Sequence, residues 1–304
     1  MTRVAAVDCG TNTIRLLIAD VGGGELREVD RRLTIVRLGQ GVDATGRFAP
    51  EAFVRTFAAC DEYAAVISAH DVERIRFVAT SAARDVANAD EFFAGVRKRF
   101  RVEPEVITGT EEAVLSFRGA TNGLSGVESP YLVADIGGGS TELILGDDTG
   151  VEAAQSLDMG SVRMTERHLH SDPVTPEELA AATADIDSLL EATIVPLGRA
   201  RTLIGLAGTV TTVAALALDL PEYDRDAVHH ARIDNALLES ITQWLIGSTR
   251  AERAARKTIH PGRVDVIGAG ALILARLHHH LHTDGVLVSE HDILDGIALG
   301  LAEE

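Results

Sequence analysis

DIGGGSTE, at residues 135–142, sets the architecture of this chain. Apolar runs stand on either side of it, so the pattern predicts two strands joined by a tight glycine-rich hairpin. The chain opens on a related segment, because Asp8–Asp20 aligns without a gap on Asp135–Asp147. A second match, of 77–80 with 205–208, falls at nearly the same spacing. Two matches in register predict two copies of one fold.

The two hairpins have the composition of phosphate-binding loops. Glycines and small hydroxyl residues let backbone N–H groups approach a phosphate closely, since no bulky side chain intervenes. Asp8 and Asp135, at the strand ends, would repel a phosphate but could hold a divalent cation against it, usually through water. One such hairpin is in most proteins only a turn, whereas two in register indicate a two-jawed phosphate clamp. Its candidate phosphate-binding residues are Gly10, Thr11, Asn12, Thr13, Gly137, Gly138, Gly139, Ser140 and Thr141.

The composition is that of a globular protein long enough for two domains. The chain has 304 residues, of which 46% are hydrophobic and 24% are charged. We expect a first domain over 1–126 and a second over 127–304, because small residues and proline are frequent at 123–130. Packing of a final helix, 291–304, back onto the first domain is left open. The formal net charge of −18 argues against nucleic acid or an anionic membrane as a partner, but it allows a phosphate substrate in a local pocket.

Neither a disulfide framework nor a membrane segment is expected. The only cysteines are Cys9 and Cys60, and Cys9 lies in an apolar run. The first residues enter a strand pattern at once, with no apolar stretch typical of a signal peptide. The longest uncharged segment, 202–218, contains two glycines and four threonines, so it is too short and too polar for a membrane span. We therefore expect a cytoplasmic protein with reduced thiols.

The paired hairpins resemble those of the actin, sugar-kinase and Hsp70 ATPase superfamily. Within it, the sequence is similar to the exopolyphosphatase and guanosine pentaphosphate phosphohydrolase (Ppx/GppA) family nearly from end to end. Besides both hairpins, the matching motifs are Ala79–Arg84, Ile107–Ala113, Leu157–Arg163, Ala207–Thr212 and Arg263–Ile267. The chain departs from the family pattern at Thr11 and Thr13, where serine is usual. It also stops at Glu304, before the helical extension that long members carry.

The resemblance implies a fold and an activity. The fold is α/β, with two duplicated ribonuclease-H-like domains, as in actin-like ATPases, facing each other across a cleft. The activity is that of an exopolyphosphatase, a phosphoric anhydride hydrolase that releases terminal orthophosphate from inorganic polyphosphate, with guanosine pentaphosphate as a further candidate substrate. The resemblance adds Gly208 and Thr209 to the candidate phosphate-binding residues and implies a homodimer. Because basic residues are scattered and no extension follows, we expect a preference for short polyphosphates.

Two adjacent glutamates need different interpretations. Thr108 and Glu111 have the spacing of a capping box, so Glu111 is interpreted as part of a helix cap. Glu112 is not needed for the cap, and the resemblance places the catalytic carboxylate there, where it could take a proton from an attacking water. Arg84 follows a strand end, and its planar guanidinium matches phosphate oxygens, which makes it the second candidate catalytic residue. The alternatives are a solvated Glu112 and a surface Arg84 paired with Asp85.

A divalent cation, magnesium or manganese, is expected as the cofactor. We expect Asp135 and Glu142 to hold it, with Asp8 as a further candidate ligand, so that it offsets charge on the transferring phosphoryl group. Glu142 stands where the first copy has Arg15. This contrast suggests that one jaw binds metal or water and the other binds phosphate.

Two other functions of the same superfamily stay open. An ATP-dependent kinase needs an adenosine pocket, for which 206–209 could serve, and an acceptor site, which nothing in the sequence suggests. A nucleotide-sensing regulator would not need the acidic residues. The histidines at 278–280 and 282 are interpreted as a solvated helix end rather than a metal site. The basic run 97–101 is interpreted as a solvated helix face, with guidance of a polyanion as the alternative.

Overall fold

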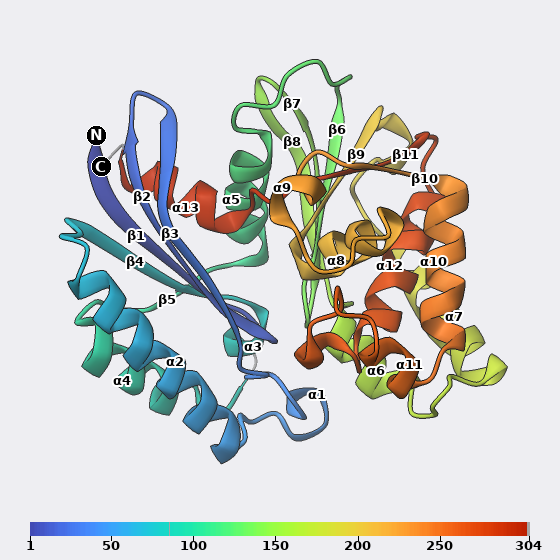
Figure 1. Ribbon diagram of the computed structural model, residues 1–304, viewed down its shortest axis with the longest axis horizontal. Coiled ribbons are helices and arrows are strands. Elements are labelled where there is room, and N and C mark those ends of the chain that lie inside the picture. Colours follow the sequence, from blue (N-terminus) through green and yellow to red (C-terminus); the bar gives the residue numbers. More distant parts are fainter. Residues whose placement is uncertain (85, 303–304) are drawn as a thin grey trace. The chain divides into compact units, whose positions relative to one another are not determined.

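The computed structural model describes residues 1–84 and 86–302, and the chain divides into two compact units (Figure 1). Unit 1 comprises Met1–Gly119 and His291–Glu304, and unit 2 comprises Ala120–Glu290. The division therefore falls before the boundary expected between 126 and 127, and the final segment groups with unit 1. Apolar packing explains this grouping, because helix α13 (Ile293–Leu301) covers strands of unit 1. Residues 303 and 304 of the expected final helix lie outside the described residues.

The sheet of unit 1 has five strands in the order β3-β2-β1-β4-β5. Neighbours among β1, β2 and β3 are antiparallel, whereas β4 runs parallel to β1 and β5 parallel to β4. Gly23 and Gly24 turn the chain between β2 and β3 at φ values of 65° and 82°, which glycine adopts without strain. The strands are β1 (Thr2–Cys9), β2 (Thr13–Gly22), β3 (Glu25–Ile35), β4 (Arg74–Ala79) and β5 (Glu105–Val106). The helices that begin before residue 120 are α1 (Val42–Thr45), α2 (Pro50–Ser68), α3 (Ser81–Arg84), α4 (Ala89–Phe100) and α5 (Gly109–Thr121).

The sheet of unit 2 repeats this plan. Its order is β10-β11-β9-β6-β7-β8, and β8-β7-β6-β9-β11 has the strand order and directions of β3-β2-β1-β4-β5. β10 is an addition that pairs antiparallel with β11. The predicted duplication is therefore confirmed, as is the α/β class. The strands are β6 (Tyr131–Ile136), β7 (Thr141–Asp147), β8 (Gly150–Leu157), β9 (Thr202–Leu206), β10 (Arg232–Asp234) and β11 (Gly285–Val288).

Strand β1 shows how one strand of unit 1 serves two cores. Ala5 and Val7 belong to the apolar cluster formed with α2 and α4, whereas Val4 and Ala6 belong to the cluster formed with α13. Successive side chains of a strand point to opposite faces of the sheet. A strand that is apolar at every position is therefore covered on both faces, which is why β1 ends deep in unit 1 and carries Asp8 to a buried position.

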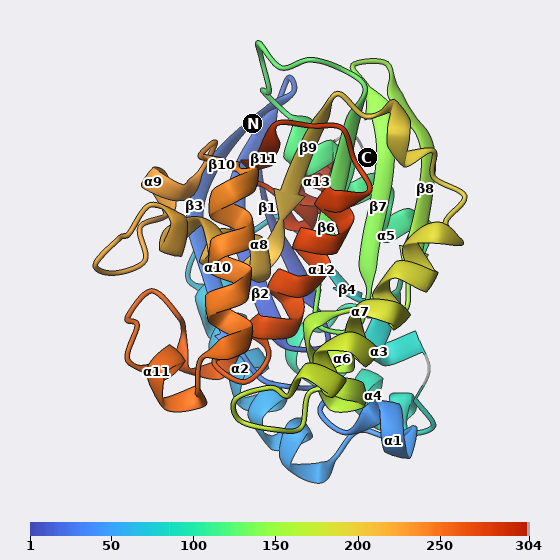
Figure 2. The same cartoon turned by 90° about the vertical axis from the view of Figure 1, so that its right-hand side faces the viewer.

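Unit 2 has one large core beneath several helices. Figure 2 shows α10 beside α12, and these two helices contact each other while α12 also contacts α6, α7 and α8. The helices are α6 (Ser161–His168), α7 (Pro176–Glu191), α8 (Ala207–Ala217), α9 (Arg225–Val228), α10 (Asn235–Gly247), α11 (Arg250–Ala254) and α12 (Ile267–His279). Two short 3₁₀ helices, Leu197–Arg199 and Pro261–Arg263, complete the unit. Across the described residues, we find no helix with both the length and the apolar character needed to span a bilayer.

Candidate active site

The first hairpin carries a buried ion pair at its base. Asp8 and Arg15 lie opposite each other in the β1–β2 register, and Arg15 donates from Nε and Nη2 to Asp8 Oδ2 at 3.0 and 2.6 Å. Asp8 is 3% exposed, and its Oδ1 has no hydrogen-bond partner among the described residues. Burial raises the pKa of Asp8, and the guanidinium of Arg15 opposes that shift. Asp8 is thus a confined carboxylate with one oxygen paired and the other unpaired.

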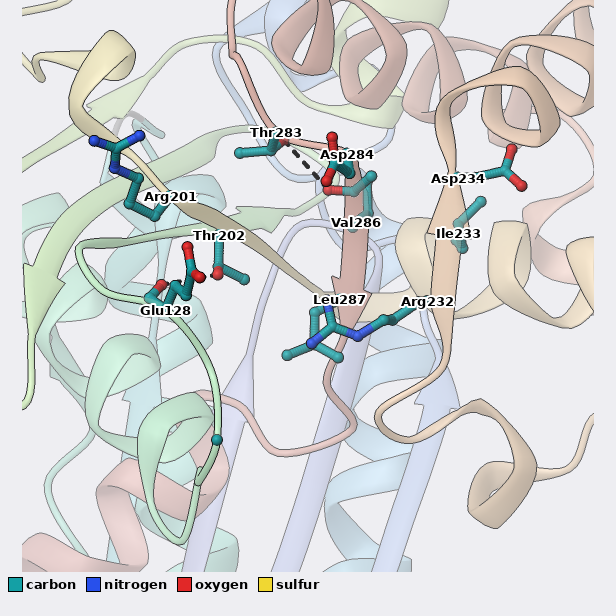
Figure 3. A pocket seen from close by; sticks show the side chains of 12 residues that line it. Glu128, Arg201, Thr202, Arg232, Ile233, Asp234, Thr283, Asp284, Val286 and Leu287 are labelled. Atoms are coloured by element: carbon teal, nitrogen blue, oxygen red, sulfur yellow. Dashed lines mark hydrogen bonds between the residues drawn. The ribbon is translucent and has the colours of Figure 1, made fainter.

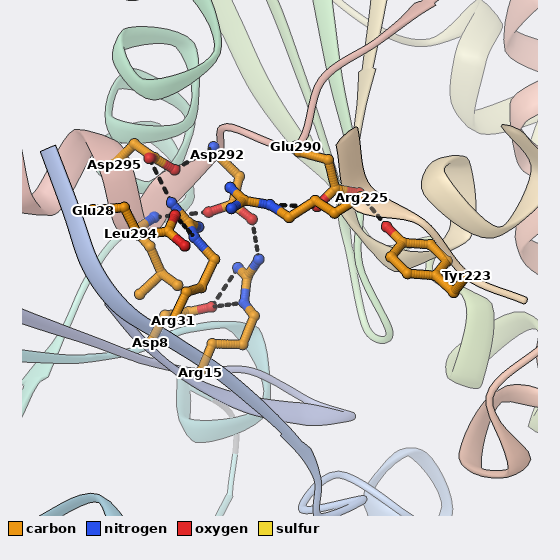
Figure 4. A network of polar contacts seen from close by, with 10 residues as sticks. All are labelled: Asp8, Arg15, Glu28, Arg31, Tyr223, Arg225, Glu290, Asp292, Leu294 and Asp295. Atoms are coloured by element: carbon orange, nitrogen blue, oxygen red, sulfur yellow. Dashed lines mark hydrogen bonds and ion pairs between the residues drawn. The ribbon is translucent and has the colours of Figure 1, made fainter. Parts of the chain in front are cut away.

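Arg15 bridges two carboxylates rather than one. Its Nη1 donates to Asp292 Oδ2, on the residue that precedes α13 (Figure 4). Burial opposes ionisation of Asp292, but Arg15 and Arg31 outweigh it and hold the pKa of Asp292 below its usual range. Arg15 is therefore engaged inside unit 1. Any contact of the first hairpin with a phosphate would therefore come from its backbone and hydroxyl groups.

The second hairpin has two carboxylates at the equivalent positions. Asp135 and Glu142 lie opposite each other in the β6–β7 register, and both are buried. Ser156 Oγ donates to Glu142 Oε1 at 2.7 Å, which holds that carboxylate against the neighbouring strand β8. Since the first hairpin has an aspartate and an arginine here, the second is the more acidic of the two and the better match to a cation.

The hairpin turns are closed alike. Gly10 N donates to Thr13 O at 2.9 Å, and Gly137 N donates to Ser140 O at 3.0 Å. In the first turn, the carbonyls of Thr11 and Asn12 accept from the amides of Gly39, Val36 and Arg37 at 2.8 to 3.0 Å. These carbonyls are thereby turned toward the protein, which is the orientation that a phosphate-binding loop needs.

Helix α6 holds the second turn in the same way. The amides of Ser161 and Val162 donate to Gly137 O and Gly138 O at 2.9 and 2.8 Å, and Arg163 Nε donates to Gly139 O at 2.7 Å. No backbone or side-chain acceptor lies within bonding distance of the Gly138 and Gly139 amides in the described part of the chain. A loop whose carbonyls are occupied and whose amides are not presents donors to an anion.

Gly160 allows this close approach. A Cβ at this position would lie 2.5 Å from the carbonyl carbon and oxygen of Gly138. Thr141, one of the predicted phosphate-binding residues, has its hydroxyl committed elsewhere, since it is fully buried and donates to Met159 O at 2.7 Å. The sequence did not indicate the part played by Arg163 and α6, although both lie in or beside the motif 157–163.

Gly208 and Thr209 lie in the first turn of α8. Arg263 covers this turn, because its Nη1 donates to Gly208 O at 3.2 Å and to Thr212 Oγ1 at 3.3 Å. A Cβ on Gly208 would lie 2.1 Å from the guanidinium carbon of Arg263. A positive side chain thus stands at a helix N-terminus, where both the amides and the charge favour an anion. Arg263 lies in the family motif 263–267, but the sequence pattern alone indicates no role for it.

Glu111 and Glu112 separate as expected. Glu111 N donates to Thr108 Oγ1 at 3.1 Å, so Thr108 caps α5, but the Glu111 carboxylate pairs with Arg76 at 2.7 Å instead of completing the capping box. Glu112 is 8% exposed, and its Oε2 accepts from Nη2 of Arg84. The two candidate catalytic side chains therefore lie together within unit 1. Asp85, the alternative partner of Arg84, lies outside the described residues.

The donor set fits a hard divalent cation, although it is small. In the described part of the chain, no group of three or more histidine, cysteine, aspartate and glutamate residues forms a metal site. Magnesium is commonly held by one or two carboxylates together with substrate phosphates, so Asp135 and Glu142 suffice for it. The histidine cluster offers no such set: His278 contacts Thr283 O at 3.0 Å, and His280 lies 3.5 Å from Asp187.

A pocket of about 660 Å³ in unit 2 is separate from these residues (Figure 3). Thr202 and Gly285, which begin the parallel strands β9 and β11, are among its lining residues. The second hairpin follows the end of β6, which is parallel to β9. The pocket lies where these parallel strands begin, whereas the hairpin lies where they end. None of the predicted site residues lines the pocket.

The model of the Ppx/GppA phosphatase family matches residues 17–304. The chain belongs to the Ppx/GppA phosphatase family. Exopolyphosphatase 2 of Mycobacterium tuberculosis is 54% identical to it over 99% of both chains. The crystal structure of an exopolyphosphatase-like protein matches with a TM-score of 0.96 at 46% identity, over 99% of this chain and 98% of that one. The predicted family and fold class are therefore confirmed.

A more distant relative in the Ppx/GppA family has another name. Guanosine-5′-triphosphate,3′-diphosphate pyrophosphatase of Aeromonas salmonicida is 27% identical, over 98% of this chain and 59% of its own length. Both relatives are named for the hydrolysis of phosphoric anhydrides. The predicted enzyme class, a phosphoric anhydride hydrolase, agrees with this membership.

Proposed function

We propose that this protein is an exopolyphosphatase, which releases terminal orthophosphate from inorganic polyphosphate. The observation that carries the proposal is the 54% identity to an enzyme of that name over 99% of both chains. The local geometry supports it: unit 2 presents hairpin amides without acceptors, and unit 1 holds a buried glutamate beside an arginine. Each of these features suits a phosphate substrate and an attacking water.

Glu112 is the proposed general base. Its carboxylate would accept the proton of a water whose oxygen attacks the terminal phosphorus, while the bond from that phosphorus to the bridging oxygen breaks. Arg84 is proposed to bind phosphate oxygens. Its Nε is buried without an acceptor among the described residues, so one donor of the guanidinium fork is unused while Nη2 donates to Glu112.

Asp135 and Glu142 are the proposed ligands of magnesium or manganese, with Asp8 as a further candidate through its unpaired Oδ1. When bound, such an ion offsets the negative charge that gathers on the transferring phosphoryl group. The chain's own contribution is to hold the two carboxylates opposite each other in the β6–β7 register, with Ser156 fixing the orientation of Glu142.

Guanosine pentaphosphate is a second proposed substrate, because the Aeromonas relative is named for a guanosine 5′-triphosphate,3′-diphosphate. Hydrolysis of its terminal 5′-phosphate breaks the same kind of bond as hydrolysis of a polyphosphate end. Dimerisation stays a prediction from the resemblance, and a cytoplasmic location stays a prediction from the sequence.

Phosphate release without an acceptor tests the proposal. The purified protein, incubated with polyphosphate and magnesium, is expected to release orthophosphate with repeated turnover in a colorimetric assay. A kinase would require ATP and an acceptor, and a sensor would bind ligand without turnover. Absence of release from polyphosphate at every chain length assayed would overturn the proposal. Parallel incubation with guanosine pentaphosphate, followed by separation of the nucleotides, tests the second substrate.

A further inference from the structure

Asp292 connects the end of the chain to the first hairpin. Its Oδ1 accepts from Leu294 N at 2.9 Å, which caps α13, while its Oδ2 accepts from Nη1 of Arg15. Asp295 completes a capping box, because its Oδ2 accepts from Asp292 N at 2.9 Å. Asp292 is 7% exposed, so both oxygens are used inside unit 1 (Figure 4). One carboxylate thus serves the helix and the arginine at once.

Arg15 transmits this contact to Asp8. The guanidinium is planar and rigid, so fixing Nη1 on Asp292 also fixes the direction of Nε and Nη2, which both point at Asp8 Oδ2. With Oδ2 held by two donors, Asp8 Oδ1 is the oxygen left without a partner among the described residues. The orientation of the Asp8 carboxylate therefore depends on a residue far away in the sequence.

We propose that Asp292 is a positioning residue for the phosphate site: it holds Arg15, and through Arg15 it fixes which oxygen of Asp8 faces the site. The proposal rests on the proposed function. It is independent of which phosphate compound is the substrate, because Asp8 stands directly before the hairpin 10–13 in either case.

The ion pair between Asp295 and Arg31 shows that the two aspartates at the start of α13 have different partners. Asp295 binds Arg31 at 2.6 Å, and Arg31 also binds Glu28 at 2.8 Å, so this pair ties the helix to β3. The two buried aspartates, one at the N-cap of α13 and one in its first turn, thus bind different arginines. Asp295 holds the helix to the sheet, whereas Asp292 holds the arginine of the hairpin.

Asp292→Asn separates capping from positioning. Asparagine is as good an N-cap as aspartate, so the bond from Leu294 N is kept, but an amide cannot replace the charged acceptor for Arg15. Asp234→Asn is the matched control, because Asp234 also caps a helix by accepting from Leu237 N at 2.9 Å but is exposed and forms no ion pair with an arginine among the described residues.

The test is a double-mutant cycle on the full chain. Asp292→Asn is expected to lower kcat on polyphosphate about tenfold or more, with KM within about threefold and Tm within a few degrees of the wild type, and Asp234→Asn to change none of these. In an Arg15→Lys background, where an ammonium cannot bridge both carboxylates, Asp292→Asn should cost little further. An unchanged kcat in Asp292→Asn, or an equal loss in both backgrounds, would overturn the proposal.

Amide hydrogen exchange tests the positioning role of Asp292 separately from the proposed exopolyphosphatase function. If the wild type releases no phosphate from polyphosphate, the proposed function fails, and the positioning role is then decided by amide exchange over residues 8–15. Exchange there is expected to be several-fold faster in Asp292→Asn and unchanged in Asp234→Asn. Equal exchange rates in the wild type and Asp292→Asn would contradict the positioning role whatever the substrate.

Discussion

Glu111 and Glu112 are adjacent on the chain, but their carboxylates have different partners. Glu111 is bound by Arg76 and its side chain is 44% exposed, whereas Glu112 is buried beside Arg84. Residues one position apart on a helix point about 100° apart, which is enough to send one carboxylate to the surface and the other inward. The role of each glutamate can therefore be tested by the same substitution, glutamate to glutamine.

Glu112→Gln is expected to lower turnover on polyphosphate on the order of 100-fold or more while the substrate still binds. Glutamine keeps the size and a polar contact but cannot accept the proton of the water. Glu111→Gln is the matched control, and it should cost little because an exposed ion pair contributes less than about 1 kcal/mol. Steady-state kinetics and a binding measurement on both variants check this. A larger loss in Glu111→Gln would mean that the catalytic carboxylate has been assigned to the wrong residue.

Asp135→Asn is expected to raise the magnesium concentration needed for half-maximal activity. A neutral amide is a much poorer ligand for a hard cation than a carboxylate. Turnover at saturating magnesium should recover in part for Asp135→Asn but not for Glu112→Gln, because only the first defect is one of metal affinity. Titration of activity with magnesium measures this. Identical magnesium curves for the wild type and Asp135→Asn would remove Asp135 from the metal site.

At the scale of elements, Tyr63 joins α2 to the sheet of unit 1. Its hydroxyl donates to Ile14 O at 3.1 Å, and Thr34 Oγ1 lies 2.9 Å from it. The side chain is fully buried, and burial raises the pKa of Tyr63 to about 12. An unfolded tyrosine ionises near pH 10, so the folded state binds more protons than the unfolded state between pH 10 and 12. Stability must fall over that window as the pH rises.

Tyr63→Phe is therefore expected to be less stable than the wild type at pH 8, by about 1 kcal/mol for the lost hydrogen bonds. At pH 11 the gap should narrow by about 1 kcal/mol, since phenylalanine has no proton to lose. Denaturant unfolding of both proteins at the two pH values checks this. A gap that is the same at pH 8 and pH 11 would show that Tyr63 ionises with its ordinary pKa in the fold.

The sequence predicted the elements that depend on local pattern. The residue pattern predicts short strands over 74–79 and 202–206 and a helix over 235–247, and β4, β9 and α10 have these bounds. The pattern also predicts a helix over 176–197, but α7 ends at Glu191. The helix α6 was not predicted, because eight residues with few apolar positions give no clear helical period.

The site was predictable as far as its motifs extend. The hairpins, Glu112 and Arg84 lie in short segments whose residue types already point to phosphate chemistry. The bond between Asp292 and Arg15 could not be found in this way, because Asp292 belongs to no motif and the tertiary fold alone brings it to Arg15. Arg263 does belong to a motif, but its contact with Gly208 is visible only once α8 is placed.

For the whole molecule, the charge distribution bears on substrate length. The formal net charge is −18, and the one basic run is partly neutralised: Arg97 binds Glu103 at 2.6 Å, and Arg99 binds Asp61 at 2.8 Å. Arg99 also lies 4.4 Å from the centre of the Phe57 ring. These arginines are held by their own unit and form a poor track for a long polyanion.

We therefore predict that kcat/KM is higher for tripolyphosphate-sized substrates than for chains of several hundred units. Interactions between exposed charges fade over roughly 8 Å at physiological salt, so phosphates beyond the first few would meet an acidic surface and gain little. The comparison is made at equal concentrations of chain ends and equal ionic strength. A clear advantage for long chains that is eroded by salt would instead support a basic track, for which Arg97→Gln is the diagnostic variant.

The grouping of residues 291–302 with unit 1 has a consequence for synthesis. Val4, Ala6 and Leu17 are translated before unit 2, but the side chains of α13 that pack against them are translated after it. More than half of the chain, all of unit 2, is translated in between. At about 5–20 residues per second, the part of this apolar face that α13 covers stays uncovered for on the order of ten seconds. Unit 1 thus starts to emerge before unit 2 but is completed only after it, and over that interval the uncovered part of its sheet is open to non-native contacts.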